Sequence, residues 1–251
     1  MFRRNALSPL GVVLVTQAAP LHAQVLADSV WHVGLDIEVR MLATGVWLHT
    51  SYQTYPGGIR VPSNGLIIQN GDSLLIVDSA WGELLTQRMV DAIETRFERR
   101  ISDVVITHSH YDRMAGTAVF QHRGARVVAH PMTRRLANEQ GLPLPDTLSG
   151  VTEPGGTTRI GPVEVFYGGP GHSPDNMMVW IPAERVLFGG CAVRAASSGS
   201  LGNVTHADLM RWPETIRLAQ QRYGSAQIVV PGHGDPGDVD LLAHTQALLV
   251  R

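Results

Sequence analysis

Residues 104–113 read VVITHSHYDR, in which a run typical of a β-strand is followed at once by His108, His110 and Asp112. Imidazole nitrogens and carboxylate oxygens are ligands that zinc binds in proteins. A loop just beyond a strand can turn both histidines toward one metal ion while the aspartate reaches a neighbouring ion. The pattern is only moderately specific, because His-x-His-x-Asp also arises by chance.

Three further candidate ligands follow, each at the end of a short apolar run. His172 stands in Gly-His-Ser-Pro, Cys191 in Phe-Gly-Gly-Cys, and His233 in Val-Val-Pro-Gly-His-Gly. Six side chains of these types can supply two nearly complete zinc sites with positions left open for water. Either histidine alone would ordinarily be explained as a hydrogen-bonded core residue. Together with the first cluster, they predict a metal-dependent hydrolase with two zinc ions.

The N-terminus has the pattern of a secretory signal peptide. Arg3 and Arg4 precede an apolar stretch over residues 6–19, and Ala23 is the expected last residue before cleavage. That stretch is too short for a permanent membrane anchor. We therefore expect residues 1–23 to be a signal peptide and residues 24–251 to form one exported domain, which works in a periplasm without membrane attachment.

The composition is that of an ordinary globular protein. Hydrophobic residues make up 44% of the 251, charged residues 17%, and the net charge is -2, so the chain lacks the basic surplus of a nucleic-acid-binding protein. All 20 basic residues are arginine, so a substrate anion would have to be held by guanidinium. No long apolar surface stripe is evident, and we expect a monomer that acts on a small molecule.

Cys191 is the only cysteine, so the chain has no partner for an internal disulfide. A free thiol is a liability in an oxidising compartment, and zinc would protect it as a bound thiolate. A buried, inert cysteine is the ordinary alternative. The position directly after Leu187-Phe188-Gly189-Gly190, where a strand meets a loop, favours ligation.

Hydrophobic periodicity predicts two successive series of strands and helices. The expected strands are residues 46–50, 66–69, 74–77, 104–107, 126–129, 163–167, 177–181, 186–188 and 228–230, and the expected helices are 82–99, 113–120, 206–222 and 239–249. Thr205 and Asp208 have the spacing of a capping box for the third helix. Two such halves favour an α/β protein in which two sheets face each other with helices outside, an α/β/β/α sandwich.

At the ligand motifs the sequence resembles the metallo-β-lactamases, specifically subclass B1, over roughly residues 46–234. The resemblance implies a four-layer αββα sandwich of the metallo-β-lactamase type. It also implies that the first zinc ion is held by His108, His110 and His172, and the second by Asp112, Cys191 and His233. Relatives with a histidine directly after the aspartate generally lack this cysteine, whereas here Arg113 occurs together with Cys191.

The resemblance extends to residues that would bind substrate. Asn203 matches an asparagine whose amide polarises the lactam carbonyl, and Arg194 falls where many relatives carry a lysine that pairs with the substrate carboxylate. Residues 52–62, with Tyr55 and Ile59, look like a flexible flap, and Trp81 would form the floor of the pocket. The ordinary alternatives are a solvated loop for Asn203 and Arg194, a plain hairpin for the flap, and a core tryptophan. Asp78 is a candidate carboxylate for orienting a ligand or a water molecule.

The implied reaction is hydrolysis of penicillins, cephalosporins and carbapenems, which would confer antibiotic resistance. A zinc-bound hydroxide would attack the lactam carbonyl, with Asn203 and the first metal stabilising the oxyanion. Asp112 would be primarily a ligand and secondarily a proton relay. Two alternatives stay open: a lactone or thioester hydrolase on the same scaffold, and an exported zinc-binding protein without turnover. Six further histidines in the expected mature domain have no ligand context and are assigned no chemistry, namely His32, His49, His122, His130, His206 and His244.

Overall fold

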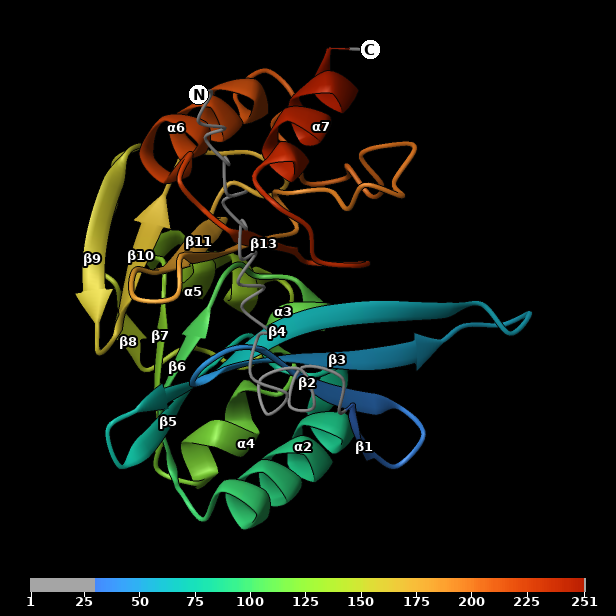
Figure 1. The fold of residues 1–251 in the computed structure, drawn as a ribbon, viewed down its shortest axis with the longest axis vertical. Helices are drawn as coiled ribbons and strands as arrows, with labels where there is room; N and C mark the ends of the chain where they lie inside the picture. The colour runs from blue at the N-terminus through green and yellow to red at the C-terminus, as the bar shows by residue number, and fades with distance from the viewer. Residues whose placement is uncertain (1–29, 251) are drawn as a thin grey trace, which may run out of the picture.

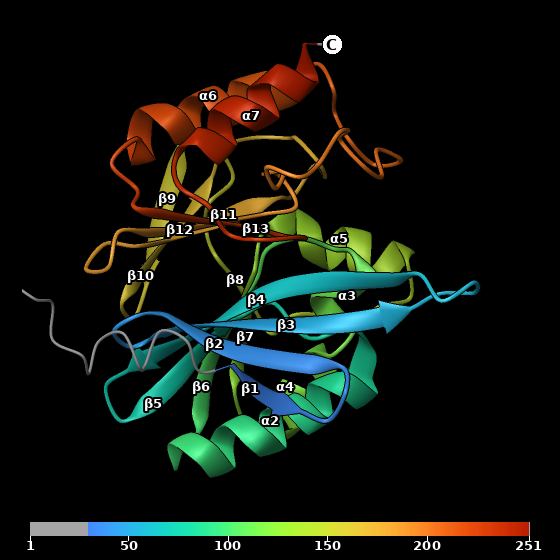
Figure 2. The same ribbon diagram turned by 45° about the vertical axis from the view of Figure 1, so that its right-hand side comes forward.

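The computed structural model describes residues 30–250, so the predicted signal peptide lies outside the described residues. Two β-sheets pack face to face, and helices cover their outer faces (Figures 1 and 2). The predicted α/β sandwich is confirmed. No helix in the described part of the chain is both long and apolar enough to cross a bilayer.

The first sheet has eight strands in sequence order, antiparallel from β1 to β5 and parallel from β5 to β8. Its strands are β1 (Trp31–Val33), β2 (Ile37–Ala43), β3 (Val46–Thr54), β4 (Arg60–Asn70), β5 (Ser73–Val77), β6 (Ile101–Ile106), β7 (Arg126–Ala129) and β8 (Thr147–Leu148). On its outer face lie α2 (Gly82–Phe97) and α4 (Thr117–His122), with α3 (Tyr111–Met114) directly after β6 and α5 (Pro131–Glu139) after β7.

The second sheet has five strands in the order β13-β12-β11-β10-β9. They are β9 (Gly156–Ile160), β10 (Val163–Tyr167), β11 (Met177–Ile181), β12 (Val186–Gly190) and β13 (Ile228–Pro231), with only β12 and β13 running parallel. Helices α6 (Trp212–Tyr223) and α7 (Asp240–Leu249) cover its outer face.

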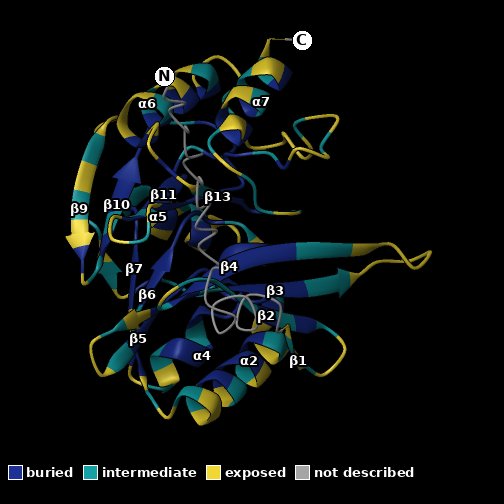
Figure 3. Cartoon of the chain, viewed as in Figure 1, coloured by how far each residue is buried: buried dark blue, intermediate teal, exposed yellow. Residues whose placement is uncertain are grey.

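Three hydrophobic clusters correspond to the three interfaces between the four layers. Strands β4 and β5 each contribute side chains to two of these interfaces. Leu66 and Val77 face the second sheet, whereas Ile67 and Ile76 face α2, because successive side chains of a strand point to opposite faces. Both faces are therefore buried (Figure 3), which explains why these strands have continuous apolar runs rather than alternating ones.

Two helix predictions need correction. The expected helix 113–120 is two short helices, α3 and α4, separated by Ala115 and Gly116. The expected helix 206–222 begins only at Trp212, and the predicted capping box is wrong, since the Thr205 N–H donates to Asn203 Oδ1. Pro213 accounts for this start, because its missing N–H is tolerated in the first turn of a helix but not in the interior.

Candidate metal centre and substrate pocket

The six predicted ligands converge at one edge of the two facing sheets. His108 and His110 follow β6, and Asp112 lies in the first turn of α3. From the second sheet come His172 in the β10–β11 loop, Cys191 directly after β12, and His233 shortly after β13. The loops beyond the strand ends make no ladder hydrogen bonds, so their backbone can turn side chains toward a shared point.

Three of the imidazoles form one group. His110 Nδ1 lies 3.1 Å from His108 Nε2 and 3.1 Å from His172 Nε2. Two nitrogens bound tetrahedrally to one zinc ion lie about 3.3 Å apart, so the spacing fits such an ion. Burial lowers the pKa of His172 to about 3 and that of His108 well below its usual value, and the neighbouring imidazoles act in the same direction. Neutral imidazole is the form that binds metal.

A chain of hydrogen bonds orients His108. Its Nδ1 lies 3.1 Å from Thr107 Oγ1, and that hydroxyl donates to Asp78 Oδ2 at 2.8 Å. The Thr107 backbone N–H donates to Asp78 Oδ1 at 2.7 Å. Since the hydroxyl proton is committed to the carboxylate, the hydroxyl accepts from His108 Nδ1–H, which leaves the lone pair on Nε2 for a metal. Asp78 therefore lies behind a ligand, where the sequence predicted an orienting carboxylate.

Asp112, Cys191 and His233 form the second group. His233 Nε2 lies 3.3 Å from Asp112 Oδ2 and 3.3 Å from Cys191 Sγ, and Cys191 Sγ lies 3.9 Å from Asp112 Oδ2. Ligands of one tetrahedral zinc ion with these atom types lie about 3.4 to 3.6 Å apart. His233 Nδ1 is 2.6 Å from the Pro62 carbonyl oxygen, to which it donates, so Nε2 faces the group.

The second group attracts a cation. Burial disfavours the charged form of His233, but the Cys191 thiolate and the Asp112 carboxylate outweigh it and raise the pKa of His233 to about 10. Burial also opposes ionisation of Asp112, yet the Arg113 guanidinium and His233 hold the pKa of Asp112 well below its usual range. Two anionic ligands around one imidazole suit a divalent ion, which competes with the proton on His233.

Arg113 is a fully buried guanidinium behind the second group. Its Nη2 lies 2.8 Å from Asp112 Oδ2 and donates to the Gly232 carbonyl at 2.7 Å, and its Nη1 lies 3.6 Å from Asp78 Oδ2. Burial lowers the pKa of Arg113, but the surrounding carboxylates and the Cys191 thiolate raise it above its usual value. The arginine therefore stays charged and connects α3 to the loop that carries His233.

A cavity of about 340 Å³ opens over both groups. It is lined by Tyr55, Val61, Trp81, His110, Asp112, His172, Arg194, Gly202, Asn203 and His233. Four of the five predicted substrate-binding residues are thus brought together. Ile59 is the exception, because it is 63% exposed near the tip of the β3–β4 hairpin, which extends beyond both sheets (Figure 1).

Aromatic side chains form one wall of this cavity. The Tyr55 and Trp81 rings meet edge to face with centroids 6.3 Å apart, and the Trp81 and Tyr111 rings lie 6.5 Å apart. Trp81 is therefore a wall residue that is partly exposed, and not a core residue. Tyr111 was not predicted, although its place inside His-Ser-His-Tyr-Asp could have indicated it.

Arg194 and Asn203 also line the cavity and lie in the loop between β12 and α6. The buried Nε of Arg194 has no hydrogen-bond partner within the described residues. Its guanidinium packs close to Gly202, where a Cβ atom would come within 3.0 Å of Nη2. Asn203 Oδ1 accepts the Thr205 N–H at 3.0 Å, which leaves the Asn203 amide NH₂ as a free donor.

Two residues that the sequence did not indicate, Asp175 and His206, contact the loops that carry the candidate ligands. Asp175 is fully buried, and its Oδ2 accepts the Ser109 N–H at 2.9 Å and the Thr133 hydroxyl at 2.7 Å. The exposed His206 places Nδ1 2.9 Å from His110 Nε2. His206, which nothing in the sequence singled out, therefore contacts a candidate ligand.

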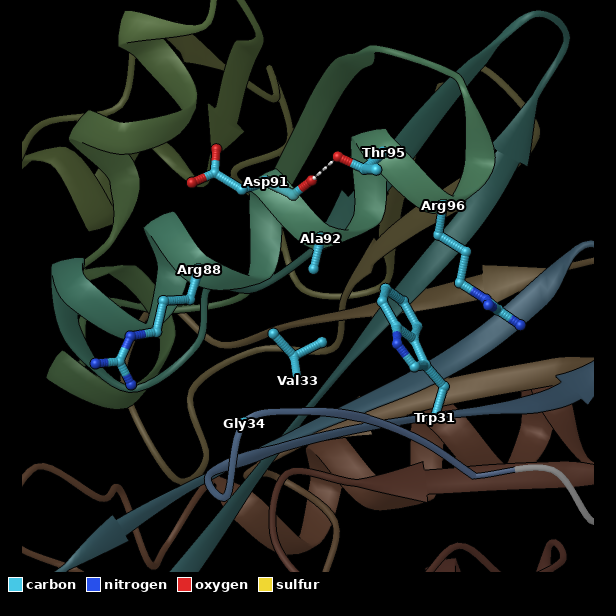
Figure 4. A pocket seen from close by; sticks show the side chains of 8 residues that line it. All are labelled: Trp31, Val33, Gly34, Arg88, Asp91, Ala92, Thr95 and Arg96. Atoms are coloured by element: carbon cyan, nitrogen blue, oxygen red, sulfur yellow. Dashed lines mark hydrogen bonds between the residues drawn. The ribbon is translucent and has the colours of Figure 1, made fainter.

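A larger cavity of about 800 Å³ lies elsewhere, between β1, the turn that follows it and α2. In Figure 4, Trp31, Val33 and Ala92 face one another across it, with Arg88 and Arg96 at its sides. It contains no histidine and none of the six ligands. The chemistry therefore belongs to the smaller cavity.

Comparisons with known proteins agree with this geometry. The model of the metallo-beta-lactamase superfamily matches residues 58–233. The chain is 41% identical over 215 residues to a metallo-beta-lactamase type 2 from Bacillus cereus, covering 85% of this chain and 82% of that one. It is 32% identical over 238 residues to a metallo-beta-lactamase type 2 from Bacteroides fragilis, covering 94% of both.

Solved structures give the same result. A metallo-beta-lactamase from Hirschia baltica superposes with a TM-score of 0.83 and 34% identity, covering 85% of this chain and 98% of that one. The metallo-beta-lactamase FIM-1 from Pseudomonas aeruginosa, solved in its mono-zinc form, superposes with a TM-score of 0.83 and 32% identity, covering 86% of this chain and 96% of that one. The predicted resemblance is confirmed: the chain belongs to the metallo-β-lactamase superfamily and is a hydrolase.

Proposed function

We propose that this chain is a β-lactamase that uses two zinc ions. His108, His110 and His172 would hold the first ion, and Asp112, Cys191 and His233 the second. Two three-ligand groups at one cavity support the proposal: His110 Nδ1 lies 3.1 Å from both His108 Nε2 and His172 Nε2, and the ligand atoms of Asp112, Cys191 and His233 lie within 4.8 Å of one another. Three protein ligands per ion are typical of catalytic zinc, whereas structural zinc usually has four.

Bound zinc lowers the pKa of a coordinated water to about 7 and so supplies a hydroxide nucleophile at neutral pH. The protein's own contribution is to keep the ligands in the right form. Thr107 fixes the tautomer of His108, and the Pro62 carbonyl fixes that of His233. Arg113 keeps Asp112 ionised, so that Asp112 acts as a ligand and not as an acid.

Arg194 would bind the carboxylate that penicillins, cephalosporins and carbapenems share. Its side chain lines the cavity and is only partly buried, so the charged end of Arg194 faces the space that a substrate would fill. A planar guanidinium can hold a carboxylate through two parallel hydrogen bonds. This would place the lactam ring between the guanidinium and the ligand groups.

The other side of the cavity would position the rest of the substrate. The free amide NH₂ of Asn203 is a suitable donor to the lactam carbonyl oxygen as that oxygen gains charge. Tyr55 and Trp81 offer apolar surface to the substrate side chain. Gly57 and Gly58, both at positive φ, shape the tip of the β3–β4 hairpin and would let it close as a flap.

We further propose that residues 1–23 direct export to the periplasm, where a monomeric enzyme would destroy β-lactams and confer antibiotic resistance. The lone cysteine supports this, since a thiolate held by zinc is protected in an oxidising compartment. Fractionation of expressing cells with N-terminal sequencing tests it. A mature N-terminus near residue 24 in the periplasmic fraction is expected, and an intact cytoplasmic chain would contradict it.

The substrate class is tested by a panel run on the purified, zinc-saturated protein. A penicillin, a chromogenic cephalosporin and a carbapenem are compared with a lactone and a thioester of similar size. We expect kcat/KM to be highest for β-lactams that carry the carboxylate. Preference for the lactone or the thioester would overturn the β-lactamase assignment, and metal analysis of the same sample counts the ions.

A further inference from the structure

We propose that His206 is a positioning residue for the first metal site. Through one hydrogen bond it would hold the ring of His110 and also anchor the loop that carries Asn203. This inference rests on the proposed assignment of His108, His110 and His172 as ligands. It does not depend on which substrate the enzyme cleaves.

The direction of the hydrogen bond follows from the ring chemistry of His110. Its Nδ1 faces His108 Nε2 and His172 Nε2 at 3.1 Å each, so Nδ1 is the nitrogen that would bind the metal. A neutral imidazole that ligates through one nitrogen carries its proton on the other. His110 Nε2–H must therefore donate, and His206 Nδ1, at 2.9 Å, must accept.

With this contact, two of the three histidines have a hydrogen-bond partner on the nitrogen that faces away from the metal site. The distal nitrogen of His108 is held by Thr107 Oγ1, whereas His172 Nδ1 has no partner within the described residues. For His110 the partner is an imidazole from a segment 96 residues away, with ring centroids 5.1 Å apart. Hydrogen bonds to the distal nitrogen of a metal-binding histidine fix its orientation and typically contribute roughly 10- to 100-fold in metal affinity.

The same hydrogen bond anchors the loop between β12 and α6, the irregular orange segment of Figure 1. From residue 199 to residue 205 its hydrogen bonds are local, such as Thr205 N–H to Asn203 Oδ1 and Ala207 N–H to the Val204 carbonyl. The loop then meets the site twice, through His206 and through the Asp208 N–H, which donates to the Gly171 carbonyl at 2.8 Å beside His172. Asn203 therefore lies three residues from an anchor on a metal ligand.

His206 is exposed, so its substitution can be separated from misfolding. Substitutions of exposed side chains usually leave the stability of the fold nearly unchanged. The matched pair is His206→Asn and His206→Leu, which are similar in size and shape. The asparagine side chain of the first variant offers an acceptor oxygen, and the leucine side chain of the second does not. His122→Ala removes an exposed imidazole on α4 and serves as the control.

The experiment measures zinc affinity of the three-histidine group by competition with a chelating dye. Each variant is made in a Cys191→Ser background, in which the second group is weakened. We expect His206→Leu to lose roughly 10- to 100-fold in affinity, His206→Asn to recover most of that loss, and His122→Ala to match the parent. In proteins that retain Cys191 and are loaded with cobalt in place of zinc, the cobalt–thiolate charge-transfer band reports on the second group. His206→Leu should leave this band unchanged.

A second readout follows the loop in the zinc-loaded protein. Hydrogen–deuterium exchange over residues 199–207 should rise in His206→Leu and stay at the parent level in His122→Ala. Unchanged zinc affinity and exchange in His206→Leu, or equal losses in the leucine and asparagine variants, would overturn the proposal. If the parent binds zinc and shows these differences but does not cleave β-lactams, the proposed function fails while the role of His206 stands.

Discussion

The two ligand groups differ in charge. Burial and neighbouring imidazoles keep His108 and His172 neutral, so the first group adds no charge to a bound ion. The second group adds the carboxylate of Asp112 and the thiolate of Cys191, with Arg113 close behind. Electrostatic attraction therefore favours a cation most strongly at the second group, while an ion in the first keeps more of its Lewis acidity.

Replacing Cys191 should affect the two groups unequally. A serine hydroxyl at this position stays protonated at neutral pH, so Cys191→Ser replaces an anionic ligand with a weak neutral one. We expect the zinc content of the dialysed protein to fall from two ions per chain toward one, measured by atomic absorption. Two ions held as tightly as in the parent would contradict ligation by Cys191.

Substitution of Arg194 tests the carboxylate anchor. A hydrogen-bonded charge is worth about 1.5 to 3 kcal/mol, so Arg194→Ala should raise KM for a carboxylate-bearing cephalosporin roughly tenfold to hundredfold. Arg217→Ala, which removes a surface arginine paired with Glu214, is the matched control. Steady-state kinetics on the cephalosporin and on its carboxylate ester measure the effect. An equal loss on the ester would show that Arg194 does not act through the carboxylate.

Contiguous motifs made most of the site predictable from sequence. Each of the six ligands lies in a short motif beside an apolar run, and Arg194 and Asn203 follow Cys191 closely. His206 and Asp175 were not predictable in this way. Asp175 stands three residues after His172, but its contact with Ser109 spans 66 residues, and that of His206 with His110 spans 96, so neither partner could be read from the local sequence.

At the level of elements, three strands were predicted with their observed bounds. The ranges of β7, β10 and β11 match those expected, because their apolar runs are bounded by turn residues. Strands β1, β2, β8 and β9 were missed. Of these, β8 has two residues and β9 reads GTTRI, so neither has the apolar run that identifies a strand. Helix α5 was also missed, although Pro131 in its first turn is a typical start signal.

The close approach of β12 and the loop after β13 requires a glycine at position 232. A Cβ atom there would lie 2.6 Å from Cys191 Sγ and 2.7 Å from the Cys191 backbone nitrogen. Backbone cannot yield as a flexible side chain does, so Gly232→Ala should displace Cys191, lower zinc content and cost about 1 to 3 kcal/mol in stability. Gly199→Ala, where the added Cβ meets open space, is the control. Metal analysis and urea denaturation that do not distinguish the two variants would refute this packing.

His49, in the middle of β3, links stability to pH. Burial lowers the pKa of His49 to about 4, and its Nε2 lies 3.3 Å from the Val77 carbonyl. The unfolded chain takes up this proton near a pH of about 6.5, whereas the folded protein does so only near pH 4. Stability that is present above about pH 6.5 is therefore lost as the pH falls toward 4, by about 3 kcal/mol over the whole window.

The variant His49→Gln keeps an N–H donor but does not titrate. Urea denaturation of metal-stripped protein between about pH 7.5 and pH 4 should show a steeper loss of stability in the parent than in this variant. Comparing the two removes the contribution of the ligand histidines, which both proteins share. Parallel pH profiles would show that His49 is not the buried group responsible.

For the whole molecule, the sandwich places the site where its two sheets meet. His108, His110 and Asp112 come from the first sheet and its loops, whereas His172, Cys191 and His233 come from the second. Ligand clusters combine residues from both sheets, since one joins His108 with His172 and Cys191 and another joins Asp112 with Cys191 and His233. Periodicity predicted the layers, but the pairing of ligands across them required the structure.

The six proposed ligands would hold the metal ions that supply the nucleophile, so activity should depend on the metal. The most direct test is a zinc titration of chelator-stripped protein, followed by hydrolysis of a chromogenic cephalosporin. We expect no hydrolysis by the stripped protein and full recovery as zinc fills the His/Asp/Cys groups. Undiminished hydrolysis by protein shown to be free of metal would contradict this expectation.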